Sequence, residues 1–119
     1  MTQEVRDFVV EKSKELIDAP TCCEELREAA RAWLTAAGTE KEAAETEKYL
    51  AELAEDIVTV DGLIAFAESE GGKKVFGEEK AQEVAAHARE IKAQGARYCD
   101  CPACAAVEAI LENKEQITA

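Results

Sequence analysis

Apolar residues recur every three or four positions along most of the chain, and this spacing limits the fold more than any other feature of the sequence. It places apolar side chains on one face of an α-helix, whereas a half-buried strand needs strict alternation. Alanine and glutamate are frequent, and both favour helices. Glycine and proline fall at isolated positions between the apolar runs, where helices end. We therefore predict an all-α protein: a compact up-and-down bundle of five to six helices with no sheet.

Capping patterns and helix breakers set the expected helix boundaries. Capping boxes in Thr21–Glu24 and Thr39–Glu42 begin the second and third helices. Asp61 is expected to cap the fourth helix, which Gly71-Gly72 interrupts. Helices are thus expected at about residues 2–18, 21–37, 39–57, 61–70, 78–94 and from Pro102 onward, with one more turn at Lys73–Phe76.

The length of 119 residues predicts one helical domain, residues 1–119, with a cysteine-rich knuckle at 98–104. Such a chain can bury a core without obligatory disulfides or metals. Its 26 acidic and 14 basic residues give a net charge of −12. Polyanionic nucleic acid and anionic lipid would be repelled, so neither is expected as a partner.

The first residues, "MTQEVRDF", lack the basic and apolar regions of a secretory signal. The longest apolar stretch, Gly62–Ala67, is far too short to span a bilayer. We therefore expect a cytoplasmic protein whose thiols stay reduced. The odd number of cysteines, five, also argues against a closed disulfide framework.

Three of the cysteines lie within six residues, in the stretch "CDCPAC". Proline is favoured in the first turn of a helix, so Pro102 predicts a helix start with Cys101 at the N-cap and Cys104 at the third position. The positive end of the helix dipole favours the thiolate, the form that binds metal. Together with Cys99, these residues offer three thiolates and lack only a fourth ligand for a tetrahedral site.

Cys22 and Cys23 are expected in the first turn of the second helix, and either could supply that fourth ligand. The alternative is that both pack as small apolar residues. Zinc is the default metal for four thiolates, and its expected role is to pin the last helix to the second. An iron–sulfur cluster is the other possibility, because a Cys-Cys pair with a later C-x-x-C resembles the cysteine-rich domains of heterodisulfide reductases, which hold such clusters.

Two other functions stay open. Cys101-Pro102-Ala103-Cys104 looks like the C-P-x-C active site of glutaredoxin-like proteins, but their fold needs strands that this chain is not expected to form. Thiol redox chemistry or metal sensing by Cys101 and Cys104 is therefore the second hypothesis. The third is a protein-interaction module with no chemistry. No catalytic residue is predicted, so an enzyme is the less favoured class; the only histidine, His87, is expected on a helix surface.

Four stretches also resemble a family of short proteins from anaerobic clostridia-like bacteria. They are "FVVEKSKELIDAPTC", "AARAWLTAAGTEKEA", "LIAFAESEGGKKVFG" and "GARYCDCPACAAVEAIL", and together they span nearly the whole chain. These proteins commonly carry the label of heat-shock protein or molecular chaperone. The resemblance implies a bacterial cytoplasmic protein with a stress-related role, and it supplies no catalytic residue.

Overall fold

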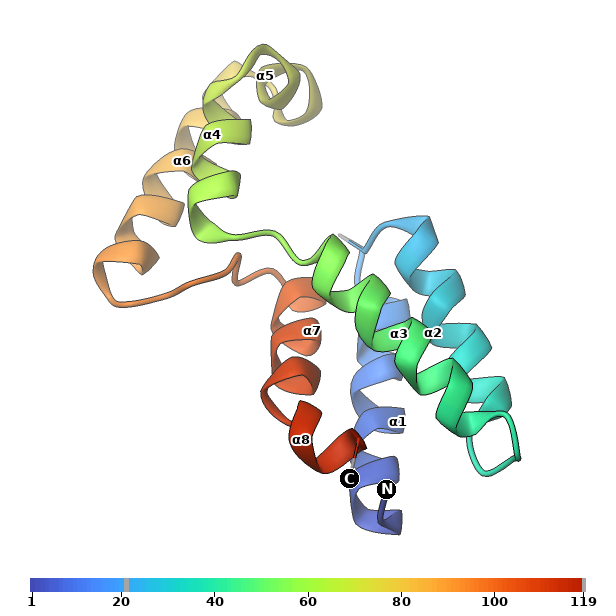
Figure 1. The fold of residues 1–119 in the computed structure, drawn as a ribbon. Coiled ribbons are helices and arrows are strands. Elements are labelled where there is room, and N and C mark those ends of the chain that lie inside the picture. Colours follow the sequence, from blue (N-terminus) through green and yellow to red (C-terminus); the bar gives the residue numbers. More distant parts are fainter. Residues whose placement is uncertain (21, 119) are drawn as a thin grey trace. The chain divides into compact units, whose positions relative to one another are not determined.

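The structure is a computed structural model that describes residues 1–20 and 22–118 (Figure 1). The described residues form helices and no strand, which confirms the predicted all-α fold. The helices are α1 (Gln3–Asp18), α2 (Glu24–Ala36), α3 (Glu42–Asp56), α4 (Val60–Glu68), α5 (Glu70–Phe76), α6 (Glu78–Ala93), α7 (Pro102–Glu112) and α8 (Lys114–Thr118). None of them is long and apolar enough to cross a membrane.

The helices divide into two compact units. Unit 1 comprises Met1–Ile57 and Asp100–Ala119, with α1, α2, α3, α7 and α8. Unit 2 comprises Val58–Cys99, with α4, α5 and α6. The single domain expected from the chain length stays a prediction, because compact units can still unfold together as one cooperative domain.

Unit 1 has a core of large side chains. Its helix α1 packs against α2 and α7, α2 against α3, and α3 against α7, and neighbouring helices run up and down (Figure 1). The largest fully buried side chains all belong to this unit: Trp33, Leu16, Leu53, Ile110, Val9, Val107 and Ser13. On α2 the buried face is formed by Leu26, Ala30, Trp33 and Ala36, so Trp33 lies near its centre.

Four buried side chains of unit 1, those of Trp33, Thr46, Ser13 and Tyr49, have their polar atoms hydrogen-bonded. Trp33 Nε1 donates a hydrogen bond to Thr46 Oγ1 at 2.9 Å, and that hydroxyl donates to the carbonyl of Glu42 at 2.7 Å. The hydroxyls of Ser13 and Tyr49 lie 2.7 Å apart, and the Trp33 and Tyr49 rings stack with centroids 5.9 Å apart. These bonds offset the cost of burying polar groups and fix the register of α1, α2 and α3.

Unit 2 is built on small side chains instead. Helices α4, α5 and α6 all pack against one another. Their buried residues are Val60, Ala67, Gly72, Ala81, Ala85, Ala88 and Ile91. Gly72 allows the closest approach, because a Cβ atom there would stand 2.0 Å from the backbone oxygen of Phe66 in α4.

Hydroxyl side chains, not the predicted residues, set the starts of α4 and α5 in unit 2. Thr59 Oγ1 accepts the backbone N–H of Gly62 at 3.0 Å, so Thr59 caps α4 and the prediction of Asp61 as the cap was wrong. Ser69 ends α4 and caps α5 by accepting the N–H of Gly72 at 3.1 Å. Gly71-Gly72 therefore lies inside α5 and does not interrupt α4, because the serine hydroxyl satisfies the new helix end.

The predicted capping box at Thr39–Glu42 was also wrong. Helix α3 begins at Glu42, and its N-cap is Lys41, without a side-chain cap bond. The Glu42 carboxylate accepts the N–H of Gly38 at 3.2 Å and pairs with the Arg6 guanidinium, whose Nη2 lies 3.0 Å from Oε2. These contacts lower the pKa of Glu42, chiefly through the Arg6 hydrogen bond. The Glu42 carboxylate thus forms an ion pair with Arg6, which is distant in the sequence, instead of taking part in a capping box.

Three further helix boundaries depart from expectation or cannot be compared. Cys22 and Cys23 precede α2 instead of lying in its first turn, since α2 begins at Glu24. The capping oxygen predicted at Thr21 lies outside the described residues. The last predicted helix is divided at Asn113, whose side-chain amide donates to the carbonyl of Ala109 at 2.8 Å and competes with regular helix bonding.

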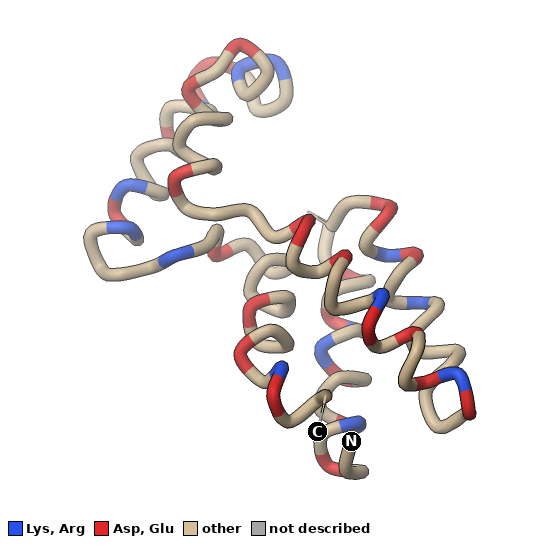
Figure 2. The backbone as a smooth tube through the Cα atoms, viewed as in Figure 1, with Lys and Arg blue, Asp and Glu red and all other residues tan. Residues whose placement is uncertain are grey.

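Charge is distributed unequally between the units (Figure 2). Unit 1 carries 19 acidic and 8 basic residues, a net charge of −11, whereas unit 2 carries 7 and 6, a net charge of −1. Nearly all of the acidity that disfavours nucleic acid and anionic lipid as partners therefore belongs to unit 1.

The close approach at Gly72 predicts that Gly72→Ala destabilises the protein by about 1–3 kcal/mol through steric overlap with α4. Gly71→Ala is the matched control in the same helix, because a Cβ there would meet only side-chain atoms, at 3.5 Å or more. It should be neutral or stabilising by up to about 1 kcal/mol, as alanine is the better helix former. Urea unfolding followed by circular dichroism measures both, and equal effects would contradict the packing of α5 against α4.

The buried Tyr49 hydroxyl predicts a loss of stability in alkali. Burial raises the pKa of Tyr49 from 10.0 to about 12. The contribution of the neutral Tyr49 hydroxyl to the free energy of unfolding is complete below pH 10 and is lost as the pH rises towards 12. The reason is that Tyr49 ionises at lower pH in the unfolded chain than in the folded protein. The loss should be on the order of 2–3 kcal/mol. Tyr49→Phe should lack this part of the pH dependence in urea unfolding between pH 9 and 12, and the same alkaline slope in both proteins would contradict it.

Candidate metal centre

Backbone pairing within unit 2 holds Cys99 in an extended conformation. The N–H of Cys99 donates to the carbonyl of Val58 at 2.9 Å, and the N–H of Val60 donates to the carbonyl of Arg97 at 2.9 Å. Residues 58–60 fall between two of the predicted helices, 39–57 and 61–70, and no pairing was expected there. The signal for this pairing is the run Val58-Thr59-Val60, because β-branched residues favour extended backbone.

Cys101 and Cys104 take the positions predicted from Pro102. Helix α7 begins at Pro102, Cys101 is its N-cap, and the Cys101 sulfur accepts the backbone N–H of Cys104 at 3.4 Å. Sulfur thus does here what a serine or aspartate oxygen does at other helix starts. The bond places the Cys101 sulfur at the positive end of the α7 dipole.

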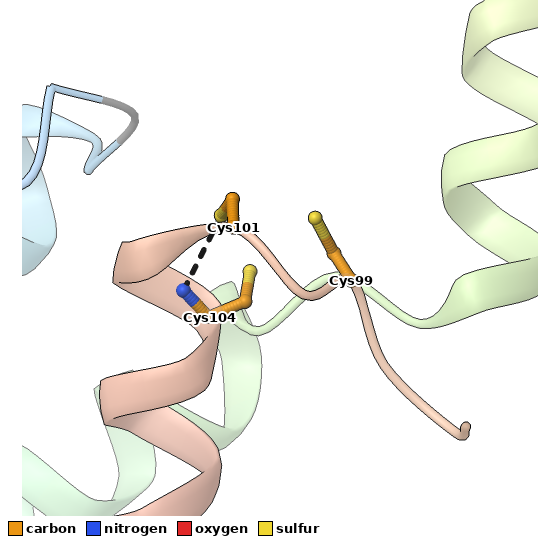
Figure 3. Close-up of side chains that lie close together, drawn as sticks. All are labelled: Cys99, Cys101 and Cys104. Atoms are coloured by element: carbon orange, nitrogen blue, oxygen red, sulfur yellow. Dashed lines mark hydrogen bonds between the residues drawn. The ribbon is translucent and has the colours of Figure 1, made fainter. Parts of the chain in front are cut away.

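The sulfur atoms of Cys99, Cys101 and Cys104 converge (Figure 3). All three lie within 4.8 Å of one another, so together they could hold a metal ion. Zinc–sulfur bonds of about 2.3 Å put the sulfurs of a tetrahedral site roughly 3.8 Å apart. The cluster would need to contract by about an ångström at its widest, which side-chain rotation and a small shift of the chain before Pro102 can provide.

The three residues differ in exposure. Cys104 is buried, at 7% exposure, and belongs to the first turn of α7, whereas Cys99 and Cys101 are half-buried. All five cysteines are thiols and not disulfides. The cluster is therefore partly shielded from water but open to an incoming ion or small molecule through Cys99 and Cys101.

Cys22 and Cys23 are not part of the convergent set, and their place as ligands stays a prediction. Cys22 is buried at 7% exposure in the core of unit 1, against which Cys101 also packs, and Cys23 is exposed at the N-cap of α2. The Cys22 sulfur donates to the carbonyl of Cys23 at 3.4 Å. Of the two residues, Cys22 is thus the one that shares surroundings with the cluster.

Burial and negative charge oppose ionisation of these two thiols. Burial is the main cause of the raised pKa of Cys22, with smaller contributions from Cys23, Asp56 and Cys101 and an opposing one from Arg27. The pKa of Cys23 is raised chiefly by burial and further by Asp56. A bound cation would reverse this balance, since it stabilises thiolates and carboxylates alike.

A pair of carboxyl groups beside these thiols was not foreseen from the sequence. A hydrogen bond to Asp56 raises the pKa of Glu52, and Asp56 Oδ2 is buried without a hydrogen-bond partner among the described residues. The two residues are four apart in α3, a spacing that places them on one helix face. Nothing local in the sequence shows that the end of α3 lies close enough to Cys22 for the Asp56 charge to act on its thiol.

His87, the only histidine, is exposed on α6 and lies outside the cysteine cluster.

No protein-family model, curated protein or solved structure matches the chain. What can be said of function therefore depends on the chemistry of the site itself.

The N-cap role of Cys101 predicts that Cys101→Ser keeps the metal-free protein at least as stable as the wild type, because a serine oxygen caps well. Cys101→Ala should be less stable than Cys101→Ser by about 1 kcal/mol. Urea unfolding in the presence of a chelator separates the two. Equal stability of the serine and alanine variants would show that the sulfur does not cap α7.

Proposed function

We propose that the protein binds one zinc ion through the thiolates of Cys99, Cys101 and Cys104. The observation that carries the proposal is the convergence of the three sulfur atoms within 4.8 Å. Packing alone rarely requires three cysteines in six residues, and thiolates are soft ligands that suit zinc. Four-coordinate zinc is the usual choice for a structural site made mainly of cysteine.

Cys22 is the proposed fourth ligand. Three features favour Cys22 over Cys23 as this ligand. Cys22 is buried, it belongs to the core against which Cys101 packs, and a negative charge on Cys101 opposes ionisation of the Cys22 thiol. Electrostatic coupling of this kind requires that the two thiols lie near each other. Cys23 is exposed and occupies the N-cap position of α2 without a side-chain cap bond, so it lacks the burial that links Cys22 to the core beside Cys101.

The proposed role of the ion is structural. Bound to Cys22, Cys101 and Cys104, it would join the start of α7 to the segment before α2, both within unit 1. Metal binding would then be coupled to folding, because the unfolded chain does not present these ligands together. Proton release would accompany binding, since ligating thiols must lose their protons.

The resemblance to short bacterial proteins labelled as heat-shock proteins or chaperones adds the biological setting to this proposal. We propose a cytoplasmic protein with a stress-related role, in which zinc maintains the helical fold. Reduced thiols are the form that such a compartment provides, and they are the form that the metal needs.

Elemental analysis tests the metal directly. Protein purified anaerobically without added metal should carry about one equivalent of zinc and show no visible absorption band, since zinc is d¹⁰. Cys104→Ser and Cys22→Ser should each lower the zinc content well below that of the wild type. When the free zinc concentration is about a thousand times the dissociation constant, the free energy of unfolding of the wild type should rise by about 4 kcal/mol.

Cys23→Ser is the matched control, because it removes a thiol next to Cys22 and should leave zinc content unchanged. Circular dichroism of each variant distinguishes lost ligation from lost fold. Metal-free protein with five titratable thiols would contradict the proposal, and a visible band with bound iron would replace zinc by an iron–sulfur cluster. Zinc retained in Cys22→Ser but lost in Cys23→Ser would reverse the assignment of the fourth ligand.

A further inference from the structure

Cys101 and Cys104 form a dithiol within a single helical turn. They are three residues apart, and the sulfur of Cys101 accepts the N–H of Cys104 (Figure 3). Cys101 at the N-cap and Cys104 at the third helical position form a Cys-x-x-Cys pair at a helix start, the arrangement in which redox-active disulfides form. The two sulfurs already lie within 4.8 Å of each other, so rotation of the side chains can bring them into bonding contact.

The two thiols differ in access. Cys101 is half-buried, whereas Cys104 is buried. A small oxidant would therefore reach the Cys101 sulfur before the Cys104 sulfur. Cysteines that sense oxidants are accessible to solvent and often lie beside a resolving cysteine, and this pair has both features.

From this geometry we infer that Cys101 is a site of oxidation by hydroperoxides, that Cys104 resolves the oxidised form as a Cys101–Cys104 disulfide, and that the disulfide releases the metal. The last part rests on the proposed function, whereas the disulfide chemistry can be tested in metal-free protein. The inference thus assigns a modification site and a means of regulating the metal centre.

The reaction balances with one equivalent of hydrogen peroxide. The Cys101 thiolate attacks one peroxide oxygen, so an S–O bond forms, the O–O bond breaks, and the leaving hydroxide takes a proton to become water. The Cys104 thiolate then attacks the Cys101 sulfur, forming the S–S bond and expelling a second hydroxide, which is also protonated. Two electrons pass from the two sulfurs to the peroxide, and a dithiol reductant reverses the change by exchange.

The backbone disfavours the other pairings. Cys99 and Cys101 are separated by one residue, and Cys99 is held in extended backbone by its bond to Val58. In extended chain, Cα atoms two residues apart are about 6.6 Å from each other and successive side chains alternate, so this pair is close to the limit for a disulfide. Only Cys101 and Cys104 share one helical turn.

A disulfide would remove two of the proposed ligands. Zinc binds thiolates and not disulfides, so Cys99 and Cys22 alone would remain, too few for a structural site. The N-cap bond would also be lost or weakened, because the Cys101 sulfur must turn towards Cys104. The α7 start should therefore lose both of its stabilising contacts in the oxidised protein.

The test uses the full chain in zinc-loaded and metal-free forms with one equivalent of hydrogen peroxide. Two of the five thiols should disappear, and peptide mass spectrometry should find the Cys101–Cys104 linkage. A chromogenic chelator should report release of the zinc, and dithiothreitol should restore both thiols and zinc binding. In Cys104→Ser, the reaction should stop at a sulfenic acid on Cys101, which dimedone labels.

Cys101→Ser, which keeps a capping oxygen, should consume peroxide at least tenfold more slowly, whereas Cys23→Ser should behave as the wild type. A disulfide between any other pair, or dimedone labelling of Cys99 instead of Cys101, would overturn the inference. Zinc that stays bound after the Cys101–Cys104 disulfide forms would overturn the regulatory part. If protein that never binds zinc still forms the Cys101–Cys104 disulfide, the proposed function and the zinc release that depends on it are wrong. The assignment of the oxidation site would then stand.

Discussion

The bond between the Cys101 sulfur and the backbone N–H of Cys104 is the interaction on which the candidate site depends. It defines where α7 begins, and Pro102 makes that start possible because proline fits the first helical turn without needing a donor. With the helix begun there, Cys104 is buried and Cys101 is half-buried, and both sulfurs lie within 4.8 Å of the Cys99 sulfur. A start one turn later would separate the two thiols and leave no cluster.

The two units are stabilised in different ways. Unit 1 buries Trp33 and Tyr49 and satisfies their polar atoms with Thr46 and Ser13, so large side chains and paired hydroxyls fix its register. Unit 2 has no comparably large buried side chain among its described residues and relies on alanine faces and on Gly72. A core of small residues allows close helix contact but contributes less apolar burial, so unit 2 should be the less stable part of the chain.

The sequence predicted the features that depend on local chemistry. The all-α class, the end of α1 at Asp18, the start of α7 at Pro102 and the N-cap position of Cys101 all follow from periodicity and helix-start preferences. Some misplaced boundaries depend on local hydrogen bonds that compete with the expected caps, as at Thr59, Ser69 and Asn113. Others depend on distant partners. Arg6 pairs with the Glu42 carboxylate that the expected capping box would use, and the pairing of Val58 with Cys99 joins residues 41 positions apart. The position of Cys22 beside Cys101 likewise depends on packing within unit 1, which no local pattern reveals.

The coordination of the bound ion tests the proposed centre most directly. X-ray absorption at the zinc edge, measured on the full-length protein purified anaerobically, should show four sulfur neighbours at about 2.3 Å and no nitrogen or oxygen neighbour. In Cys22→Ser, one sulfur should be replaced by a lighter atom while the other three remain. A shell dominated by nitrogen and oxygen in the wild-type protein would contradict a centre built on Cys99, Cys101 and Cys104.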